Sequence, residues 1–144
     1  MTTPSHNEPT GLFTSTAAAY ARHRPGIPPE AVSLLADTMR DTDRPALLDL
    51  GSGTGQVPAA LLPAVPRIDR VDLVDPDQDM IRQAAATLEP LLDGRPAGFH
   101  PVVAEDFTPP FDGYRADLIT CARSFHWMDR ERVAAAVREM LRPG

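Results

Sequence analysis

Short apolar runs alternate along this chain with longer segments in which apolar residues recur every three or four positions. Four apolar runs have the length of buried strands: 46–51, 67–75, 99–106 and 116–124. Three segments have the periodicity of amphipathic helices: 53–65, 76–92 and 129–144. This alternation predicts an α/β fold in which helices flank about four mainly parallel strands.

The region before the first strand has a different character. Residues 1–11 are polar and contain prolines, so we expect a flexible tail there. An Ala-rich segment at 13–30 predicts a short helix followed by a turn broken by prolines, and 28–40 predicts a firmer helix with prolines in its first turn. We therefore expect a single domain over 12–144, in which 12–45 forms an N-terminal lid and helix.

Composition and charge limit the partners of the chain. Its 144 residues are 42% hydrophobic, which suffices for one core, and its formal net charge is −6. Lys and Arg form no cluster longer than a pair, which argues against nucleic acid and against an anionic membrane surface. No apolar run approaches a membrane span and the N-terminus has no signal-peptide pattern, so we expect a cytoplasmic protein with a small-molecule ligand. The single cysteine, Cys121, lies in an apolar run and indicates a core position rather than a zinc site.

The apolar run at 47–50, LLDL, ends in a loop, GSGTGQ, that has a glycine at every second position. Gly51, Gly53 and Gly55 can adopt positive φ and let a ligand approach the main chain, and the following helix offers unpaired N–H groups. Asp75 ends the next predicted strand, where a carboxylate can accept hydrogen bonds from the two hydroxyls of a ribose. The glycine loop and this acid together predict a nucleoside-binding site.

The spacing of the glycines distinguishes between nucleosides. A dinucleotide fingerprint requires G-x-G-x-x-G, whereas Gln56 stands here in place of the third glycine, and this disfavours a pyrophosphate. Asp49 lies within the preceding strand, and a buried acid favours a ligand with positive charge. S-adenosylmethionine carries a sulfonium, an ammonium and a ribose, so we expect 46–144 to be the half that binds this nucleoside. A glycine loop alone is equally consistent with a tight turn that binds nothing.

Several stretches resemble a known family. LLDLGSGTGQV, VDLVDPDQDM and YRADLITCARSFHWMD resemble the glycine motif, the ribose-binding acid and the fourth strand of class I S-adenosylmethionine-dependent methyltransferases, and the resemblance covers 12–144. YARHRPGIPPE and SFHW resemble its subgroup of small-molecule methyltransferases. By this resemblance the cofactor-binding residues are Asp49, Gly51, Ser52, Gly53 and Gly55 around the methionine part, Asp75 at the ribose, Pro76 and Met80 at the adenine face, and Ala104 and Glu105 at the adenine edge.

The resemblance also implies a substrate side of the site. Its residues would be Tyr20 and Arg24 in the N-terminal lid, with Arg123, Ser124, Phe125 and His126 in the loop after the fourth strand. His126 is the candidate catalytic base. A structural histidine that packs between Phe125 and Trp127 is the alternative interpretation.

Two residues depart from the family pattern, and both border the expected site. Val103 stands where many relatives have an acid before the adenine edge, so recognition of the adenine amine would fall to Glu105. Arg123 stands where the subgroup commonly has glutamine, which puts a permanent cation at the mouth of the site. A cation there does not help to bind a sulfonium.

The sheet of this family usually has seven strands in the order 3-2-1-4-5-7-6, of which this sequence matches the first four. We therefore expect the strand at 116–124 to be an edge and the apolar stripe of the last helix to face water. That stripe consists of Val133, Val137, Met140 and Leu141. Such a surface needs cover, so we expect a second protein chain to complete the sheet as a heterodimer, with a fragment of a longer protein as the alternative.

Two functions compete with methyl transfer in natural-product metabolism, such as antibiotic biosynthesis. The resemblance extends to the short subunit of the two-chain complex that closes the aziridine ring in azinomycin biosynthesis. There an amine displaces a sulfate within one molecule, Arg123 would receive the departing anion, and S-adenosylmethionine would be absent or vestigial. The third interpretation is a non-catalytic scaffold that supports a catalytic partner.

Overall fold

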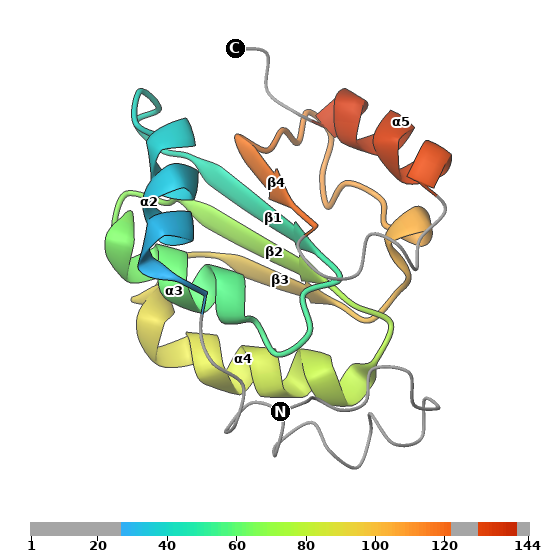
Figure 1. Ribbon diagram of the computed structural model, residues 1–144. Helices are drawn as coiled ribbons and strands as arrows, with labels where there is room; N and C mark the ends of the chain where they lie inside the picture. The colour runs from blue at the N-terminus through green and yellow to red at the C-terminus, as the bar shows by residue number, and fades with distance from the viewer. Residues whose placement is uncertain (1–26, 122–129, 141–144) are drawn as a thin grey trace.

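The computed structural model describes residues 27–121 and 130–140, which contain a four-stranded sheet in the order β3-β2-β1-β4 (Figure 1). Each neighbouring pair of strands is parallel. The strands are β1 (Ala46–Leu50), β2 (Arg70–Val74), β3 (Ala97–His100) and β4 (Leu118–Thr120). The prediction of an α/β fold with about four parallel strands is therefore confirmed.

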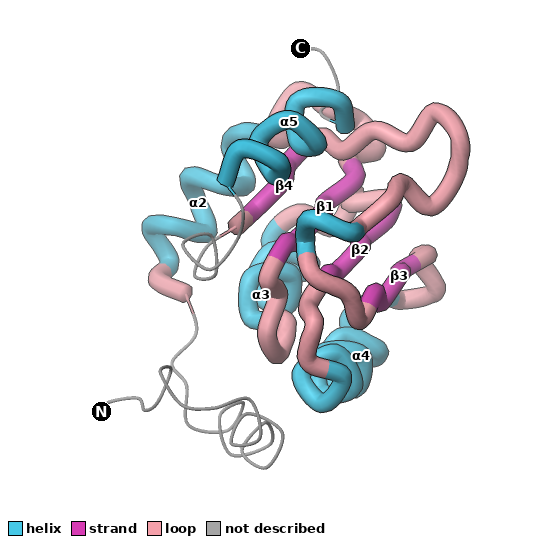
Figure 2. Tube along the Cα trace, turned by 90° about the vertical axis from the view of Figure 1, so that its right-hand side faces the viewer, coloured by secondary structure: helices cyan, strands magenta, loops and turns pink. Residues whose placement is uncertain are grey.

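Helices cover both faces of this sheet (Figure 1, Figure 2). The described helices are α2 (Pro29–Thr38), α3 (Gln56–Ala64), α4 (Gln78–Leu92) and α5 (Arg130–Met140), with one 3₁₀ turn, η1 (Ala104–Asp106). Residues of α2, α3 and α4 belong to one hydrophobic cluster, and residues of α5 and η1 belong to another. The strand order reverses between β1 and β4, and ligands of open α/β sheets bind at the carboxyl ends of strands at such a point.

The central strands contribute to both clusters because successive side chains of a strand point to opposite faces. Leu47 and Val71 belong to the cluster on the α3 and α4 side, whereas Leu48 and Val74 belong to the cluster on the α5 side. All four side chains are fully buried. Burial on both faces explains why β1 is apolar on both faces, with the exception of Asp49, rather than alternating between apolar and polar residues.

Two of the four stripe residues of the last helix, Val137 and Met140, are not exposed as expected, whereas the side chain of Val133 and all of Leu141 lie outside the described part of the chain. Met140 is 4% exposed, and together with Val137 it packs in the cluster on the α5 side of the sheet. The main chain joins this contact, since the Ala116 N–H donates to the Met140 carbonyl at 2.7 Å. The expectation is therefore wrong for these two residues, because α5 covers the sheet face. Leu118 and Ile119 of β4 are half-buried, and each packs against one of the two clusters.

The third strand is shorter than the predicted 99–106. It ends at His100 because Pro101 has no N–H for the strand ladder, and the Val102 N–H turns back to the His100 carbonyl at 2.9 Å. Residues 101–106 form a turn and η1 instead of extended strand. The chain that follows β3 therefore turns over the end of the sheet.

Two helices begin later than predicted. The helix expected over 53–65 begins at Gln56, because Gly55 has left-handed backbone with φ of 83°. The helix expected from 76 begins at Gln78, because Asp77 is its N-cap and accepts hydrogen bonds from two N–H groups of the first turn. Both starts therefore lie next to the ends of β1 and β2.

Candidate functional site

The loop between β1 and α3, residues 51–55, is held over the end of β2. We call it the glycine loop. The Gly51 and Ser52 N–H groups both donate to the carbonyl of the last residue of β2, at 2.7 and 3.0 Å. The three glycines all have left-handed backbone, with φ of 67° at Gly51, 57° at Gly53 and 83° at Gly55. Residues with a side chain rarely adopt this conformation. The backbone conformation of the loop therefore explains why every second residue of it is a glycine.

Two of these glycines differ in what surrounds them. A Cβ at Gly55 would lie 3.1 Å from the Ala84 Cβ of α4 and 3.4 Å from the Leu73 Cδ2 of β2. A Cβ at Gly53 would meet no heavy atom of the described residues within 4 Å. Gly55 is therefore required by packing, whereas Gly53 borders open space.

Asp75, the residue after β2, faces the glycine loop. Its Oδ2 accepts a hydrogen bond from the Gly53 N–H at 2.9 Å, and its Oδ1 accepts one from the Asp77 N–H at 2.9 Å. The side chain is buried, and this burial raises the pKa of Asp75 although the two backbone hydrogen bonds lower it. One carboxylate thus joins the glycine loop to the start of α4.

Asp77 caps α4 and stands beside Asp75. Its Oδ1 accepts hydrogen bonds from the Asp79 N–H at 2.9 Å and the Met80 N–H at 3.3 Å. Its Oδ2 is buried with no hydrogen-bond partner among the described residues. From the sequence, Asp77 is only one of three acids near the positive end of a helix. The available signal is an Asp three residues before the first apolar residue of a periodic segment, a position that suits an N-cap.

Asp49 of β1 is the second acid at this end of the sheet. It is 2% exposed, and its Oδ1 accepts a hydrogen bond from the Thr120 hydroxyl of β4 at 2.7 Å. Burial raises the pKa of Asp49 to about 7, the hydrogen bond from Thr120 lowers it, and the charge of Asp75 raises it. The two acids identified from the sequence are thus close enough to influence each other's charge. Thr120 was not identified, because its contact with Asp49 depends on the register between β1 and β4.

Two hydroxyl groups of the glycine loop are buried without a partner. They are the Oγ of Ser52 and the Oγ1 of Thr54, which form no hydrogen bond within the described part of the chain. Buried polar atoms in native proteins are nearly always paired, so these hydroxyls indicate a polar ligand or water at the loop. Thr54 was not among the expected site residues, although its position inside the glycine motif was an available signal.

Other expected cofactor residues lie on the elements that flank the glycine loop. Pro76 is exposed and directly precedes the cap of α4, and Met80 is buried in the first turn of that helix. Ala104 and Glu105 lie in η1, after β3. The Asp75 N–H donates to the carbonyl of the last residue of β3 at 3.1 Å, so the ends of β2 and β3 adjoin.

The expected substrate-side residues lie outside the described residues. They are Tyr20, Arg24, Arg123, Ser124, Phe125 and His126. Cys121, which precedes the second gap, is half-buried, and burial raises the pKa of its thiol to about 11, with a further rise from Asp49. A neutral, half-buried thiol agrees with the expected core position.

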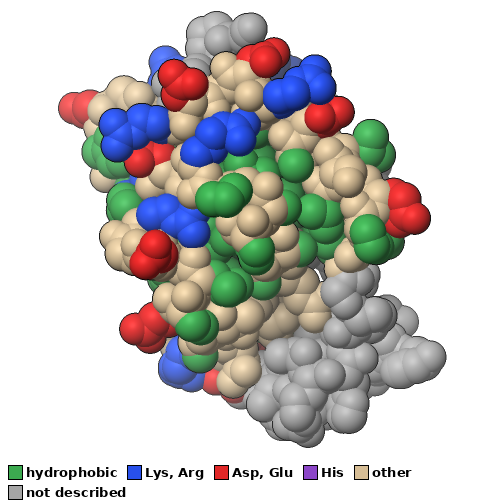
Figure 3. Space-filling view, turned by 90° about the vertical axis from the view of Figure 1, so that its left-hand side faces the viewer, with side chains coloured by type: hydrophobic (Ala, Val, Ile, Leu, Met, Phe, Trp, Pro, Cys, Tyr) green, Lys and Arg blue, Asp and Glu red, His purple; other side chains and the backbone are tan. Residues whose placement is uncertain are grey.

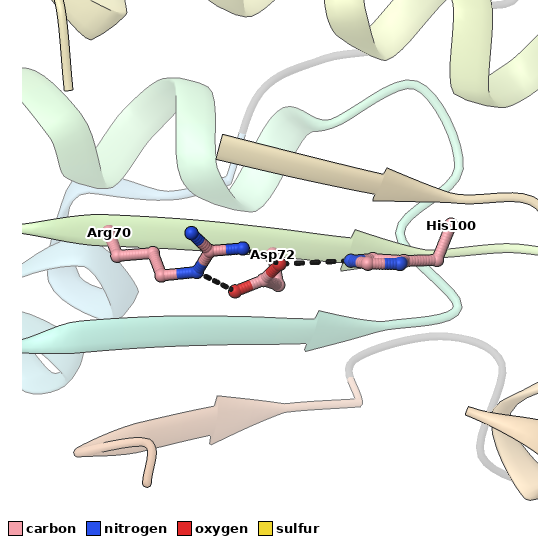
Figure 4. A network of polar contacts seen from close by, with 3 residues as sticks. All are labelled: Arg70, Asp72 and His100. Atoms are coloured by element: carbon pink, nitrogen blue, oxygen red, sulfur yellow. Dashed lines mark hydrogen bonds and ion pairs between the residues drawn. The ribbon is translucent and has the colours of Figure 1, made fainter. Parts of the chain in front are cut away.

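A second polar cluster lies on the α5 side of the sheet, along the strands rather than at their ends (Figure 4). Asp72 of β2 is fully buried; Arg70 donates to its two oxygens at 2.8 and 3.0 Å, and the His100 Nε2 lies 2.9 Å from Oδ1. A Cβ at Gly98 would clash with Asp72 and His100, so this glycine makes room for the cluster. The cluster joins β2 to β3 and was not expected from the sequence.

Three further observations concern other kinds of partner. No group of three or more His, Cys, Asp or Glu side chains in the described ranges could hold a metal ion. None of the helices that the structure describes is long and apolar enough to cross a membrane. On the face shown in Figure 3, basic and acidic side chains are interspersed around central apolar ones, so this face has no continuous basic patch.

Parallel strands in the order 3-2-1-4, with a glycine loop after β1 and an acid after β2, place the protein in the Rossmann-like α/β class. A family model described as "Methyltransferase domain" matches residues 48–144, which include the glycine loop, Asp75 and η1. The chain therefore belongs to the methyltransferase domain family, and the resemblance found in the sequence is confirmed at this level.

Individual relatives agree with this assignment. An uncharacterized methyltransferase of Mycobacterium tuberculosis is 32% identical over 132 residues, which cover 92% of this chain and 48% of that protein. Two structures of S-adenosylmethionine-dependent methyltransferases in complex with S-adenosyl-L-homocysteine share the fold. The match to the one from Thiobacillus denitrificans has a TM-score of 0.66 and 21% identity, and it covers 100% of this chain and 54% of that protein. The match to the one from Geobacter sulfurreducens has a TM-score of 0.67 and 22% identity, and it covers 91% of this chain and 51% of that protein. The chain spans about half the length of the curated relatives it matches.

Proposed function

We propose that this chain is the S-adenosylmethionine-binding half of a small-molecule methyltransferase in natural-product metabolism. The observation that carries the proposal is the Asp75 carboxylate, which joins Gly53 of the glycine loop to Asp77 at the start of α4. Each carboxylate oxygen has a lone pair beyond the one used by the main chain, so it can also accept a hydrogen bond from a ribose hydroxyl. Membership of the methyltransferase domain family supports this choice of nucleoside.

The glycine loop fits the rest of this nucleoside. The open space at Gly53 lets a ligand approach the main chain. The hydroxyls of Ser52 and Thr54, which have no partner among the described residues, can pair with its polar groups. Asp49 of β1 lies two residues before the loop, and it can supply negative charge for the cationic methionine part. When bound, the cofactor supplies an electrophilic methyl group on its sulfonium.

The proposal assigns proton removal to His126 and substrate binding to Tyr20, Arg24, Ser124 and Phe125. Methyl transfer is an in-line displacement, for which the protein mainly positions the acceptor and removes its proton. These assignments are supported by the resemblance of YARHRPGIPPE and SFHW to small-molecule methyltransferases. The same two stretches are the reason that we propose a small molecule as the substrate.

We also infer that a second protein chain completes the sheet beyond β4. Within the described residues β4 pairs with β1 on one side only, and Leu118 and Ile119 are half-buried. An edge strand with open ladder positions is a template for pairing with another chain. Sedimentation velocity of the chain without its partner should show self-association, because the β4 edge is then uncovered. A stable monomer at micromolar concentration would contradict this inference.

Calorimetry with S-adenosyl-L-homocysteine tests the proposed cofactor site. Asp75→Asn should weaken binding about tenfold or more, because an amide cannot accept at both positions that the carboxylate serves. Asp79→Asn is the matched control: it removes the same charge from the first turn of α4, but Asp79 pairs with Arg82 on the helix surface. The control should change the affinity by less than about twofold. An absence of binding by the wild type, or an equal loss in both variants, would contradict the proposal.

The same measurement separates methyl transfer from the two competing interpretations. A ring-closing displacement and a scaffold require no S-adenosylmethionine, so either would give no heat. Arg123→Gln then distinguishes these two. It should lower the activity of a ring-closing enzyme, whereas it should leave the activity of a complex that this chain only supports unchanged.

A further inference from the structure

Thr120 and Asp49 face each other across two neighbouring strands. They are register partners in the pairing of β1 with β4, and the Thr120 hydroxyl donates to the Asp49 Oδ1 at 2.7 Å. Both are buried, with 7% of Thr120 and 2% of Asp49 exposed. The same hydroxyl lies 3.5 Å from the Leu48 carbonyl, which is a much weaker contact. A side-chain partner of the buried acid therefore comes from β4.

Among the residues that the structure describes, the titratable groups that interact with Asp49 do not stabilise its charge. They are Asp75 after β2, whose charge is repulsive, and Cys121 after β4, which is a neutral thiol at pH 7. No ion pair to Asp49 is present in residues 27–121 and 130–140. Burial raises the pKa of Asp49 to about 7 even with the Thr120 hydrogen bond in place. The Thr120 hydroxyl is thus the side-chain donor that favours the ionised form.

We propose that Thr120 is a positioning residue of the cofactor site: it orients Asp49 and favours its ionised form, so that affinity for the cationic methionine part depends on pH. This inference rests on the proposed cofactor. A protonated Asp49 offers no charge to a cation, so only the ionised fraction of the protein binds with full affinity. Thr120 acts through Asp49.

Two measurable quantities follow from a group that titrates near pH 7. Its ionised fraction rises about tenfold between pH 6 and pH 8, and the apparent affinity for S-adenosylmethionine, which carries the sulfonium, should rise by the same factor. At pH 7 binding should release about half a proton per ligand, because the ligand selects the ionised form. Asp49→Asn should abolish both effects.

An NMR titration of the chain without ligand tests the role of Thr120 directly. The ¹³C carboxyl resonance of Asp49 should titrate near pH 7 in the wild type. Thr120→Val keeps the shape of the side chain without its hydroxyl and should move the midpoint upward by about one pH unit, and Thr120→Ser should restore it. Thr38→Val is the matched control, since that hydroxyl donates to Leu35 on α2. A midpoint below about pH 5, or one that Thr120→Val does not move, overturns the inference.

Calorimetry with S-adenosylmethionine, in buffers of different ionisation enthalpy, tests the link to binding. Thr120→Val should bind about fivefold more weakly than the wild type at pH 7 and about twofold more weakly at pH 8. Wild-type binding that is independent of pH and releases no proton overturns the inference and leaves the proposed function standing. A wild type that binds no ligand at any pH, while Asp49 titrates as expected, overturns the proposed function and with it the link to binding.

Discussion

The two acids at the strand ends differ in how the chain stabilises their charge. Asp75 accepts hydrogen bonds from two main-chain N–H groups, whereas Asp49 accepts one from a side-chain hydroxyl. Burial raises the pKa of both carboxyls, and that of Asp49 reaches about 7. Hydrogen bonds to the charged form oppose the cost of burial, so Asp49 is the acid whose charge costs more at neutral pH.

Asp49→Asn should stabilise the chain at high pH but not at low pH. The folded pKa of about 7 lies above the ordinary value of 3.8, so the folded state binds more protons between these values. The contribution of Asp49 to stability is therefore lost as pH rises through this interval. The amide has no such dependence and can still accept from Thr120.

Urea unfolding at two pH values measures this effect. We expect the variant to be roughly 2–4 kcal/mol more stable than the wild type at pH 8 and within about 1 kcal/mol of it at pH 4. A stability difference that is equal at both pH values would show that the pKa of Asp49 in the folded chain does not lie near 7.

Site residues could be predicted where a local motif specifies them. The glycines of the loop and Asp75 follow from the spacing of loop and strand, because main-chain conformation dictates those residue types. Thr120 could not be predicted in this way. It lies 71 positions from Asp49, and the pairing depends on the register of two strands that the sequence leaves open.

At the scale of elements, the glycine loop has one side that packs and one side that faces open space. Gly55 lies against α4 and Gly53 borders the proposed ligand. The loop therefore offers a matched pair of substitutions, since both residues have left-handed backbone.

Gly53→Ala and Gly55→Ala should separate binding from stability. Each places a side chain in left-handed backbone, which costs about 1–2 kcal/mol. At residue 55 the new Cβ would also lie 3.1 Å from Ala84, so we expect a total loss of about 3 kcal/mol in the free energy of unfolding. At residue 53 the methyl group would enter the ligand space and should weaken binding of S-adenosyl-L-homocysteine about tenfold or more. Thermal unfolding and calorimetry on both variants check this, and the reverse ranking would contradict our placement of the ligand.

The order and type of the elements could be predicted better than their ends. Val102 and Val103 continue the apolar run after β3, but Pro101 interrupts the ladder and the chain turns into η1. Likewise, the periodicity of the last helix identified its apolar stripe but not the surface against which that stripe packs. Tertiary contacts decide both features, and a local pattern does not contain them.

At the scale of the whole molecule, the centre of the proposed cofactor site is formed by residues that lie close together in the sequence. The glycine loop, Asp75 and the cap of α4 come from the consecutive elements β1, α3, β2 and α4. Thr120 of β4 adds the contact that is distant in sequence. In our account the residues that bind the nucleoside therefore lie within this chain, which spans about half the length of its curated relatives.

The central claim is that a nucleoside with a cationic methionine part binds between the glycine loop and Asp75. The most direct measurement is an NMR titration of the ¹⁵N-labelled chain with S-adenosyl-L-homocysteine. We predict that the largest amide shifts fall on residues 51–55 and 75–77 and saturate at micromolar ligand, with little change at Asp72. Shifts confined to other surfaces, or none at all, would contradict the account.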